Sequence, residues 1–138
     1  MNKKRSDAKV VVAVSGYFNP LHVGHVDYIE KAAMLGDYLV VIVNNDLQRE
    51  LKGSKEFYNE KDRCKIVSSL KWVDEVFLSI DEDKSVCKSL EAVKPKVFAN
   101  GGDRLNSEIP ERKVCLEYGI TLVDGLGQKI RASSDYLK

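Results

Sequence analysis

Short runs of branched apolar residues alternate with helix-like segments along the chain, and this alternation constrains the fold more than any other feature. The runs span residues 10–14, 38–43, 73–80, 96–100 and 120–124. The first two are apolar at almost every position, which is typical of strands that are covered on both faces. Strand–helix alternation favours parallel strands joined by right-handed crossovers. We therefore expect an α/β fold, a Rossmann-like parallel five-stranded sheet with helices on both faces.

Residues that begin or end helices lie between these runs. Gly36 and Gly119 follow helical patterns as C-terminal stops, and Pro95 requires the helix before it to end by Lys94. The lysine-rich segment 44–58 is expected to be a polar loop. The expected helices span 24–35, a segment from the cap Asn59 to Lys71, a segment from the cap Asp83 to Lys94, 107–118, and a terminal segment beginning near Ser133 or Ser134.

The chain length of 138 residues suits one compact domain, and 43% hydrophobic residues support a core. Lysine and arginine total 22 against 21 acidic residues, so the net charge of +1 gives no case for nucleic acid or an acidic membrane as partner. No apolar run is long enough to span a bilayer or to serve as a signal sequence. We expect residues 1–8 to form a flexible basic N-terminus, which could also bind phosphate, and residues 9–138 to form a single domain.

The three cysteines show neither a disulfide framework nor a CxxC pair. Cys64, Cys87 and Cys115 are odd in number and far apart in the sequence. Each falls in an expected helix, so we interpret them as structural thiols. This usage favours a reducing, cytoplasmic setting.

The loop after the first run, "SGYFNPLHVGHVD", holds both histidines of the chain. His22 and His25 lie at the start of the first expected helix, where free N–H groups favour an anion, and Gly24 permits close approach of a ligand. In parallel sheets, ligands bind beyond the carboxyl ends of the strands, where this loop would lie. A phosphate site is therefore favoured over two structural histidines. A zinc site lacks further ligands at suitable spacing.

Later loops add groups suited to phosphate, although each also has an ordinary structural interpretation. Lys52 and Lys55 flank Gly53 as point charges that could clamp a phosphate chain, or they belong to a solvated loop. Asp103 follows the fourth run in "NGGDR", which could also be a simple turn. Near the end of the chain, the helix caps and basic residues that would suit a triphosphate are Ser133, Ser134, Lys129 and Arg131.

Several common catalytic signatures are missing from the sequence. It contains no GxxxxGK[ST] phosphate-binding loop and no GxGxxG dinucleotide fingerprint. It also contains no GxSxG nucleophile elbow. These gaps argue against the corresponding reaction classes.

Taken together, the loop sequences resemble the HxGH nucleotidyltransferase superfamily. "GYFNPLHVGH" resembles the HxGH signature, and "ASS" resembles the second, Ser/Thr-rich signature. Between them, "GDYLVVIVNND", "LKG", "NEKDR", "LKWVDEV" and "NGGDR" resemble the cytidylyltransferase-like branch, which acts on glycerol-3-phosphate, choline phosphate or ethanolamine phosphate. The heptose-phosphate adenylyltransferases are nearly as similar, through "LKG", "DED" and "GGD". The resemblance runs from about Val10 to the C-terminus.

The resemblance implies that a phosphorylated metabolite attacks the α-phosphate of a nucleoside triphosphate and releases pyrophosphate. It implies catalytic roles for His22, His25 and Lys52, and substrate-phosphate contacts for Lys52 and Arg63. The position of Lys55 in the same loop makes it a further candidate for these contacts. The resemblance also implies Mg²⁺ with the triphosphate and a homodimer. The implied nucleotide-binding residues are Gly16, Tyr17, Phe18, Gly24, Asp103, Lys129, Arg131, Ser133 and Ser134.

The chain departs from the cytidylyltransferase pattern at three points. Asn19 stands where an aspartate is usual, Lys71 stands where some members have arginine, and "GQKIRASS" replaces the ending RTxGISTT. The ordered set of motifs, rather than these departures, favours transfer of CMP from CTP to a small phosphorylated or phosphonate metabolite. ATP-dependent adenylyl transfer to a heptose-like sugar phosphate or a flavin-like phosphate is the nearest alternative. A nucleotide-binding sensor without turnover is the third interpretation, and a plain flavodoxin-like binding module the fourth.

Overall fold

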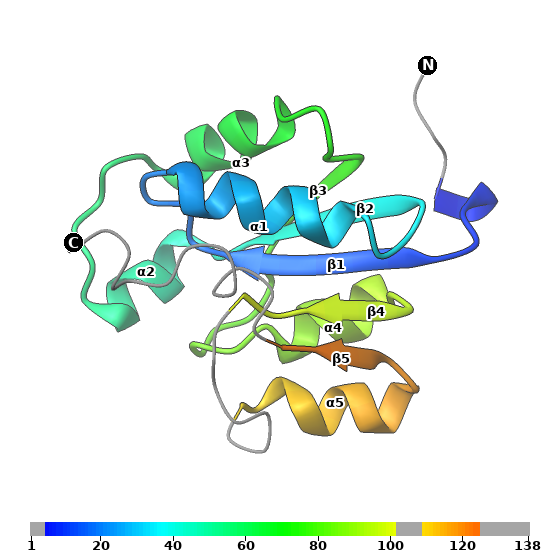
Figure 1. Cartoon of the computed structure of the whole chain (residues 1–138). Helices are drawn as coiled ribbons and strands as arrows, with labels where there is room; N and C mark the ends of the chain where they lie inside the picture. Colours follow the sequence, from blue (N-terminus) through cyan, green and yellow to red (C-terminus); the bar gives the residue numbers. More distant parts are fainter. Residues whose placement is uncertain (1–4, 102–108, 125–138) are drawn as a thin grey trace, which may run out of the picture.

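The computed structural model describes residues 5–101 and 109–124. Five parallel strands form one sheet in the order β3-β2-β1-β4-β5 (Figure 1). The strands are β1 (Val11–Gly16), β2 (Tyr38–Val43), β3 (Glu75–Leu78), β4 (Val97–Ala99) and β5 (Thr121–Val123). The expected α/β architecture is therefore confirmed, and each strand lies within or beside its apolar run.

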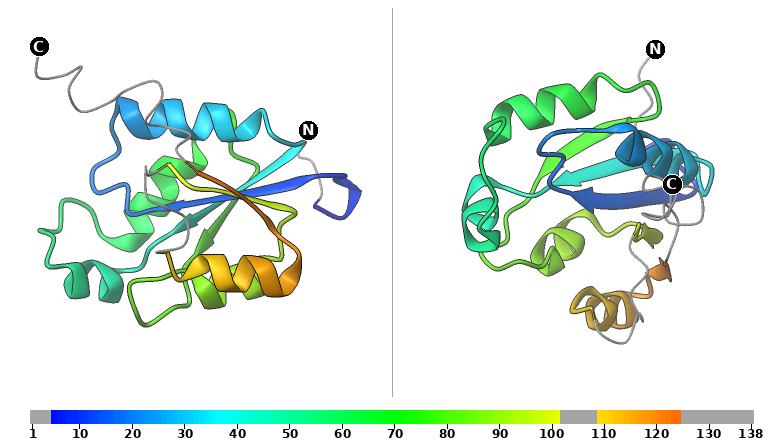
Figure 2. Two further views of the ribbon diagram at one scale, coloured as in Figure 1. Left: turned by 60° about the horizontal axis from the view of Figure 1, so that its bottom comes forward. Right: turned by 60° about the vertical axis from the view of Figure 1, so that its left-hand side comes forward.

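Helices cover both faces of the sheet, as Figure 2 shows. Helices α1 and α3 pack on one face, and α4 and α5 pack together on the other. The remaining helix, α2, lies at the edge where the strands end (Figure 1). The helices are α1 (Val23–Ala33), α2 (Asp46–Lys52), α3 (Glu60–Ser68), α4 (Cys87–Val93) and α5 (Glu111–Tyr118).

Strand β2 is the centre of the core, because every one of its residues is buried. Val41 packs with Ile29 of α1 and Val67 of α3, whereas Ile42 packs with Leu90 of α4 on the opposite face. Each such side chain contributes about 1.5–3 kcal/mol by leaving water. This two-sided burial explains why the run lacks the polar alternation of a half-exposed strand.

Helix α2 corrects the expectation that the segment 44–58 is entirely loop. Asn45 accepts a hydrogen bond from the Gln48 backbone N–H, and the Gln48 side chain accepts one from the Asn45 backbone. This reciprocal pair begins the helix, and Gly53 ends it in the left-handed conformation with φ 80°. The Asn45-x-x-Gln48 spacing and Gly53 were the sequence signals for this helix.

Other helix boundaries also differ from expectation. Helix α4 begins at Cys87 rather than beside Asp83, because the Asp81 carboxylate accepts from the backbone N–H groups of Lys88 and Ser89. Helix α3 ends at Ser68, and α5 begins only at Glu111. The expected cap Asn59 and the expected stop Gly119 are both confirmed.

Residues 5–8 are the described part of the segment that was expected to be a flexible basic N-terminus, and Arg5 contacts the rest of the domain. Arg5 to Asp7 form a short 3₁₀ helix. The Arg5 guanidinium donates to the Val93 carbonyl at 2.9 Å and pairs with Glu75 at 3.2 Å. In the described part of the chain, no helix has the length and apolarity needed to cross a membrane.

The strand order reverses direction between β1 and β4. The chain moves from β1 through β2 to β3 on one side, then returns to place β4 on the other side of β1. The crevice at the carboxyl end of such a switch point is where open α/β sheets bind ligands. The loop that carries both histidines leaves β1 at this point.

Candidate active site

The two histidines are held by the backbone at the start of α1. His22 is the N-cap residue, and its Nδ1 accepts a hydrogen bond from the Gly24 N–H at 3.0 Å. His25 Nδ1 accepts from the His22 N–H at 3.1 Å. Because both Nδ1 atoms accept, a neutral ring carries its proton on Nε2. Each imidazole therefore offers an Nε2–H donor.

The imidazoles lie against each other and form one unit. Their ring centroids are 3.7 Å apart with an interplanar angle of 21°, and Phe18 meets the His25 ring edge-on at 5.0 Å. Gly24 leaves room for this arrangement, since a Cβ atom there would lie 2.9 Å from His22 Cε1. The glycine between the histidines is thus required by the position of the His22 ring.

Burial keeps the His25 imidazole neutral. Its pKa falls from 6.5 to about 4, first because burial disfavours the charged form, and then because His22 and Lys52 add positive charge nearby. At neutral pH, His25 is therefore a hydrogen-bond donor through Nε2 rather than a cation. An arriving anion would offset part of this electrostatic cost.

Phe18 and Gly16 fix the loop that precedes the histidines. Phe18 is 2% exposed and adopts φ 53°, a left-handed conformation that is uncommon for a bulky residue. Its ring covers Gly16, where a Cβ atom would lie 2.8 Å from Phe18 Cζ. Backbone strain of this kind costs about 1–3 kcal/mol and is often found at functional sites.

Lys52, the last residue of α2, reaches the first loop. Its ammonium nitrogen lies 4.4 Å from the centroid of the Tyr17 ring, within cation–π range. Lys55 lies further along the same segment, with its ammonium nitrogen 5.8 Å from the Phe57 ring centroid. The structure therefore brings Lys52 beside the loop that carries the histidines, as the sequence suggested.

Arg63 occupies a different environment from the one its expected phosphate contact requires. The side chain is fully buried and donates to the carbonyls of Tyr58, Tyr17 and Asn44. It also pairs with the Asp46 carboxylate at 2.7 Å. Its guanidinium thus joins the first loop, the end of β2 and α2 from inside the protein. This geometry disfavours direct contact with a substrate phosphate.

A pocket of about 270 Å³ opens at the strand switch point. It lies beside the first loop, between the ends of β1 and β4, and is also bounded by the segment before α4 and the start of α5. Glu111 joins two of its walls, because its carboxylate accepts from the Val86 N–H at 2.9 Å. The lining residues are Ser15, Gly16, Tyr17, Asn44, Lys84, Val86, Phe98, Asn100, Ile109 and Glu111.

Sequence reasoning missed several residues of this region. Lys84, Asn100 and Glu111 line the pocket, and the fully buried Gln48 accepts a hydrogen bond from Asn44, another lining residue. Asn100 directly follows β4, and this position at a strand end was the available signal. No sequence signal marked Lys84 or Glu111 as a site residue. The predicted site residues Asp103, Lys129, Arg131, Ser133 and Ser134 lie outside the described residues.

The parallel sheet carries a histidine pair at its carboxyl edge and a lysine beside the same loop, which is the arrangement expected from the resemblance to the HxGH nucleotidyltransferase superfamily. Residues 13–121 match the family model described as cytidylyltransferase-like, and the chain belongs to this family of transferases.

Among curated relatives, bifunctional protein HldE of Helicobacter pylori is 37% identical over 105 residues, which cover 75% of this chain and 22% of that protein. Bifunctional protein HldE of Geotalea uraniireducens is 36% identical over 143 residues, covering 95% of this chain and 29% of that protein. The chain thus spans about a quarter of the length of these curated relatives.

Two solved structures show similar folds. The lipopolysaccharide core biosynthesis protein from Thermoplasma volcanium has a TM-score of 0.69 and 30% sequence identity, over 83% of this chain and 93% of that chain. Pantoate-beta-alanine ligase from Francisella tularensis has a TM-score of 0.58 and 14% identity, over 83% of this chain and 58% of that one, so its likeness concerns the fold alone.

Proposed function

We propose that this protein transfers a nucleoside monophosphate from a nucleoside triphosphate to a small phosphorylated polyol or sugar. An oxygen of the acceptor phosphate bonds to the α-phosphorus, the bond from the α-phosphorus to its β-bridging oxygen breaks, and pyrophosphate leaves. The observation that carries this proposal is the stacked pair His22–His25, which offers two Nε2–H donors at the start of α1.

The histidines and Lys52 stabilise negative charge at different positions on the substrates. The Nε2–H groups donate to triphosphate oxygens and stabilise the charge that develops during transfer. The N-terminus of α1 adds its partial positive charge. Lys52 neutralises the two phosphates that approach each other, and its contact with Tyr17 keeps it beside them. No side chain needs to form a covalent intermediate, because positioning and charge stabilisation suffice.

Mg²⁺ fits this scheme as a companion of the triphosphate. Within residues 5–101 and 109–124, no three His, Cys, Asp or Glu side chains gather into a possible metal site. Oxygens of the nucleotide phosphates are the ligands that Mg²⁺ prefers when a protein offers few carboxylates. The metal ion would neutralise phosphate charge, while His22 and His25 orient the chain of phosphates.

The pocket favours a hydroxyl-rich acceptor. A quaternary ammonium group is recognised by open aromatic faces. Here Lys52 already covers the Tyr17 ring, and Phe98 is only 2% exposed. Lys84 and Glu111 instead supply polar groups suited to hydroxyls and a phosphate. This lining supports a sugar phosphate over choline phosphate.

ATP is the donor that we propose. The HldE relatives match most of this chain, and the sequence resembles the heptose-phosphate adenylyltransferases through "LKG" and "GGD". CTP is the second candidate, which the cytidylyltransferase-like family match and the order of the sequence motifs favour. A homodimer remains a prediction from the resemblance.

A pyrophosphate assay tests the function. The protein is incubated with each nucleoside triphosphate, Mg²⁺ and a panel that includes sugar phosphates, glycerol-3-phosphate, choline phosphate and a flavin phosphate. We expect pyrophosphate with ATP and a sugar phosphate. Turnover with CTP alone would support the second candidate. Nucleotide binding without pyrophosphate from any pair would support the sensor interpretation.

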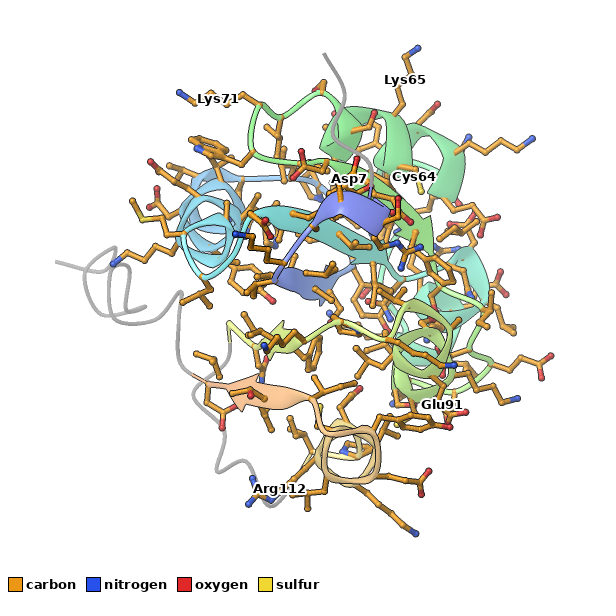
Figure 3. The ribbon with its side chains drawn as sticks, turned by 90° about the vertical axis from the view of Figure 1, so that its right-hand side faces the viewer. Asp7, Cys64, Lys65, Lys71, Glu91 and Arg112 are labelled. Carbon is orange, nitrogen blue, oxygen red and sulfur yellow. The ribbon has the colours of Figure 1, made fainter. Side chains whose placement is uncertain are left out.

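Histidine variants test the assigned residues. His22→Ala and His25→Ala should each lower kcat by about 100-fold or more, the usual effect of removing a donor to developing charge. Lys65→Ala is the control, because its side chain extends from α3 into solvent (Figure 3). Unchanged turnover in both histidine variants would contradict the assignment of this site.

A further inference from the structure

Asn19 lies in the first loop and bonds to a segment more than thirty residues away. Its Nδ2 donates to the Lys55 carbonyl at 2.7 Å. Its Oδ1 accepts from the backbone N–H groups of Phe57 at 2.9 Å and Tyr58 at 3.3 Å. One side chain therefore bonds three backbone groups of the segment that leads from α2 to α3.

These contacts require an amide side chain. The segment presents one carbonyl and two N–H groups, and an amide supplies both a donor and an acceptor. An aspartate could accept from Phe57 and Tyr58, but it would place a carboxylate oxygen against the Lys55 carbonyl. The asparagine at this position, where the related cytidylyltransferases usually have aspartate, therefore matches the hydrogen-bonding pattern of the segment.

Two arginines, Arg49 of α2 and Arg63 of α3, also donate to the backbone of this segment. The Arg49 guanidinium donates to the Ser54 carbonyl at 2.6 Å, and Arg63 Nε donates to the Tyr58 carbonyl at 3.0 Å. Lys55 lies between these two ties, and Asn19 supplies the bonds from the first loop. Figure 1 shows the loop before α1, helix α2 and this segment at the same end of the molecule.

We propose that Asn19 is a positioning residue that latches the segment 55–58 to the histidine loop, so that Lys52 and Lys55 face the triphosphate and the acceptor phosphate. This inference rests on the proposed function. The neutral amide joins the histidine loop to the segment 55–58 without placing a negative charge beside the phosphates. Asn19 acts through the lysine segment and needs no contact with the reacting atoms.

Two variants separate this latch from a purely electrostatic role. Asn19→Ala removes all three bonds, whereas Asn19→Asp keeps two acceptor bonds and loses the donor. The latch predicts the lowest kcat/KM for the acceptor in Asn19→Ala, about tenfold below wild type, with a smaller loss in Asn19→Asp. If Asn19 served only to avoid negative charge, Asn19→Asp would be the worse variant, and that order would overturn the latch.

Amide hydrogen exchange in the ligand-free protein gives a readout that does not depend on turnover. The N–H groups of Phe57 and Tyr58 should lose protection in Asn19→Ala and keep it in Asn19→Asp. Lys65→Ala serves as the control and should leave both exchange and kcat/KM unchanged. Unaltered exchange in Asn19→Ala would overturn the latch.

A double variant tests the link to the lysine. Because the latch acts through the segment that carries Lys55, adding Lys55→Ala to Asn19→Ala should lower kcat/KM by less than it does in wild type. Full additivity would mean that Asn19 does not act through this segment. A wild-type protein with no turnover on any pair would overturn the proposed function, and the exchange measurement would still decide whether the latch exists.

Discussion

At the scale of single residues, the histidine pair shows how a short loop can prepare a donor site before any ligand arrives. The Nδ1 atoms of His22 and His25 are engaged by backbone N–H groups, so the Nε2–H groups are the donors that remain. The lowered pKa of His25 keeps this imidazole neutral, which avoids the repulsion that two stacked cations would cause. Under the proposed function, the Nε2–H groups donate to phosphate oxygens of the bound triphosphate.

The pKa of His25 is a direct test of this arrangement. Burial, His22 and Lys52 lower it from 6.5 to about 4. An NMR titration of the ligand-free protein should therefore show a His25 midpoint near 4. Lys52→Ala removes one of the nearby positive charges and should raise the midpoint, whereas Lys65→Ala should not. A midpoint near 6.5 in wild type would show that His25 is not held in the neutral form.

The lowered pKa of His25 also determines the direction in which the stability of the fold changes with pH. The unfolded chain binds a proton at His25 as the pH falls through 6.5, while the folded protein resists protonation until about pH 4. The unfolded state therefore binds more protons in this window, and stability rises with pH across it. The contribution of His25 is complete above about pH 6.5 and is lost as the pH falls toward 4. Urea unfolding of wild type and His25→Ala between these pH values measures it.

At the scale of elements, α2 connects the lysine to the pocket wall. The Gln48 side chain is fully buried, accepts from Asn44 Nδ2, and donates to the carbonyls of Asp83 and Ser85. The helix that ends at Lys52 is thereby tied to the segment that carries Lys84. A movement of one would displace the other.

Gln48→Leu should destabilise the protein strongly. Leucine fills a similar volume but leaves the carbonyls of Asp83 and Ser85, of which the second lies in a buried hydrogen bond, without this donor. The expected cost is about 2–4 kcal/mol in unfolding free energy. Leu51→Ala is the matched control on the same helix, because that side chain is 48% exposed, and it should change stability by about 0.5 kcal/mol or less. Equal urea midpoints for the two variants would contradict the role of Gln48.

The elements also show what the sequence could and could not reveal. The wholly apolar β2 and the stop at Gly119 were readable because burial and left-handed turns leave local signals. Helix α2 was missed because its leucines, Leu47 and Leu51, are exposed and form no buried stripe. The burial of Arg63 depends on Tyr17, Asn44 and Asp46, which lie 46, 19 and 17 residues away in the sequence, and a fully buried arginine is rare.

At the scale of the whole molecule, the site lies where the strand order reverses. The first loop and the pocket meet between β1 and β4, so residues from both halves of the sheet line the pocket. Tyr28 of α1 strengthens this junction by donating from its hydroxyl to the Ala99 carbonyl at the end of β4. The parallel five-stranded sheet was predictable from the alternation of elements, but its strand order was not among the predictions. The lining of the pocket depends on loops without periodic patterns.

A ligand that bridges the two halves should stabilise the entire domain. Binding to the folded state alone adds about 2.7 kcal/mol at a ligand concentration of 100 times Kd, which raises Tm by several degrees. We therefore expect ATP with Mg²⁺ to raise Tm more than CTP does, because adenylyl transfer is the proposed reaction. The doubly substituted His22→Ala/His25→Ala protein should lose this shift, and Lys65→Ala should keep it. A larger shift with CTP would favour cytidylyl transfer, and equal shifts in wild type and the doubly substituted protein would place the triphosphate elsewhere.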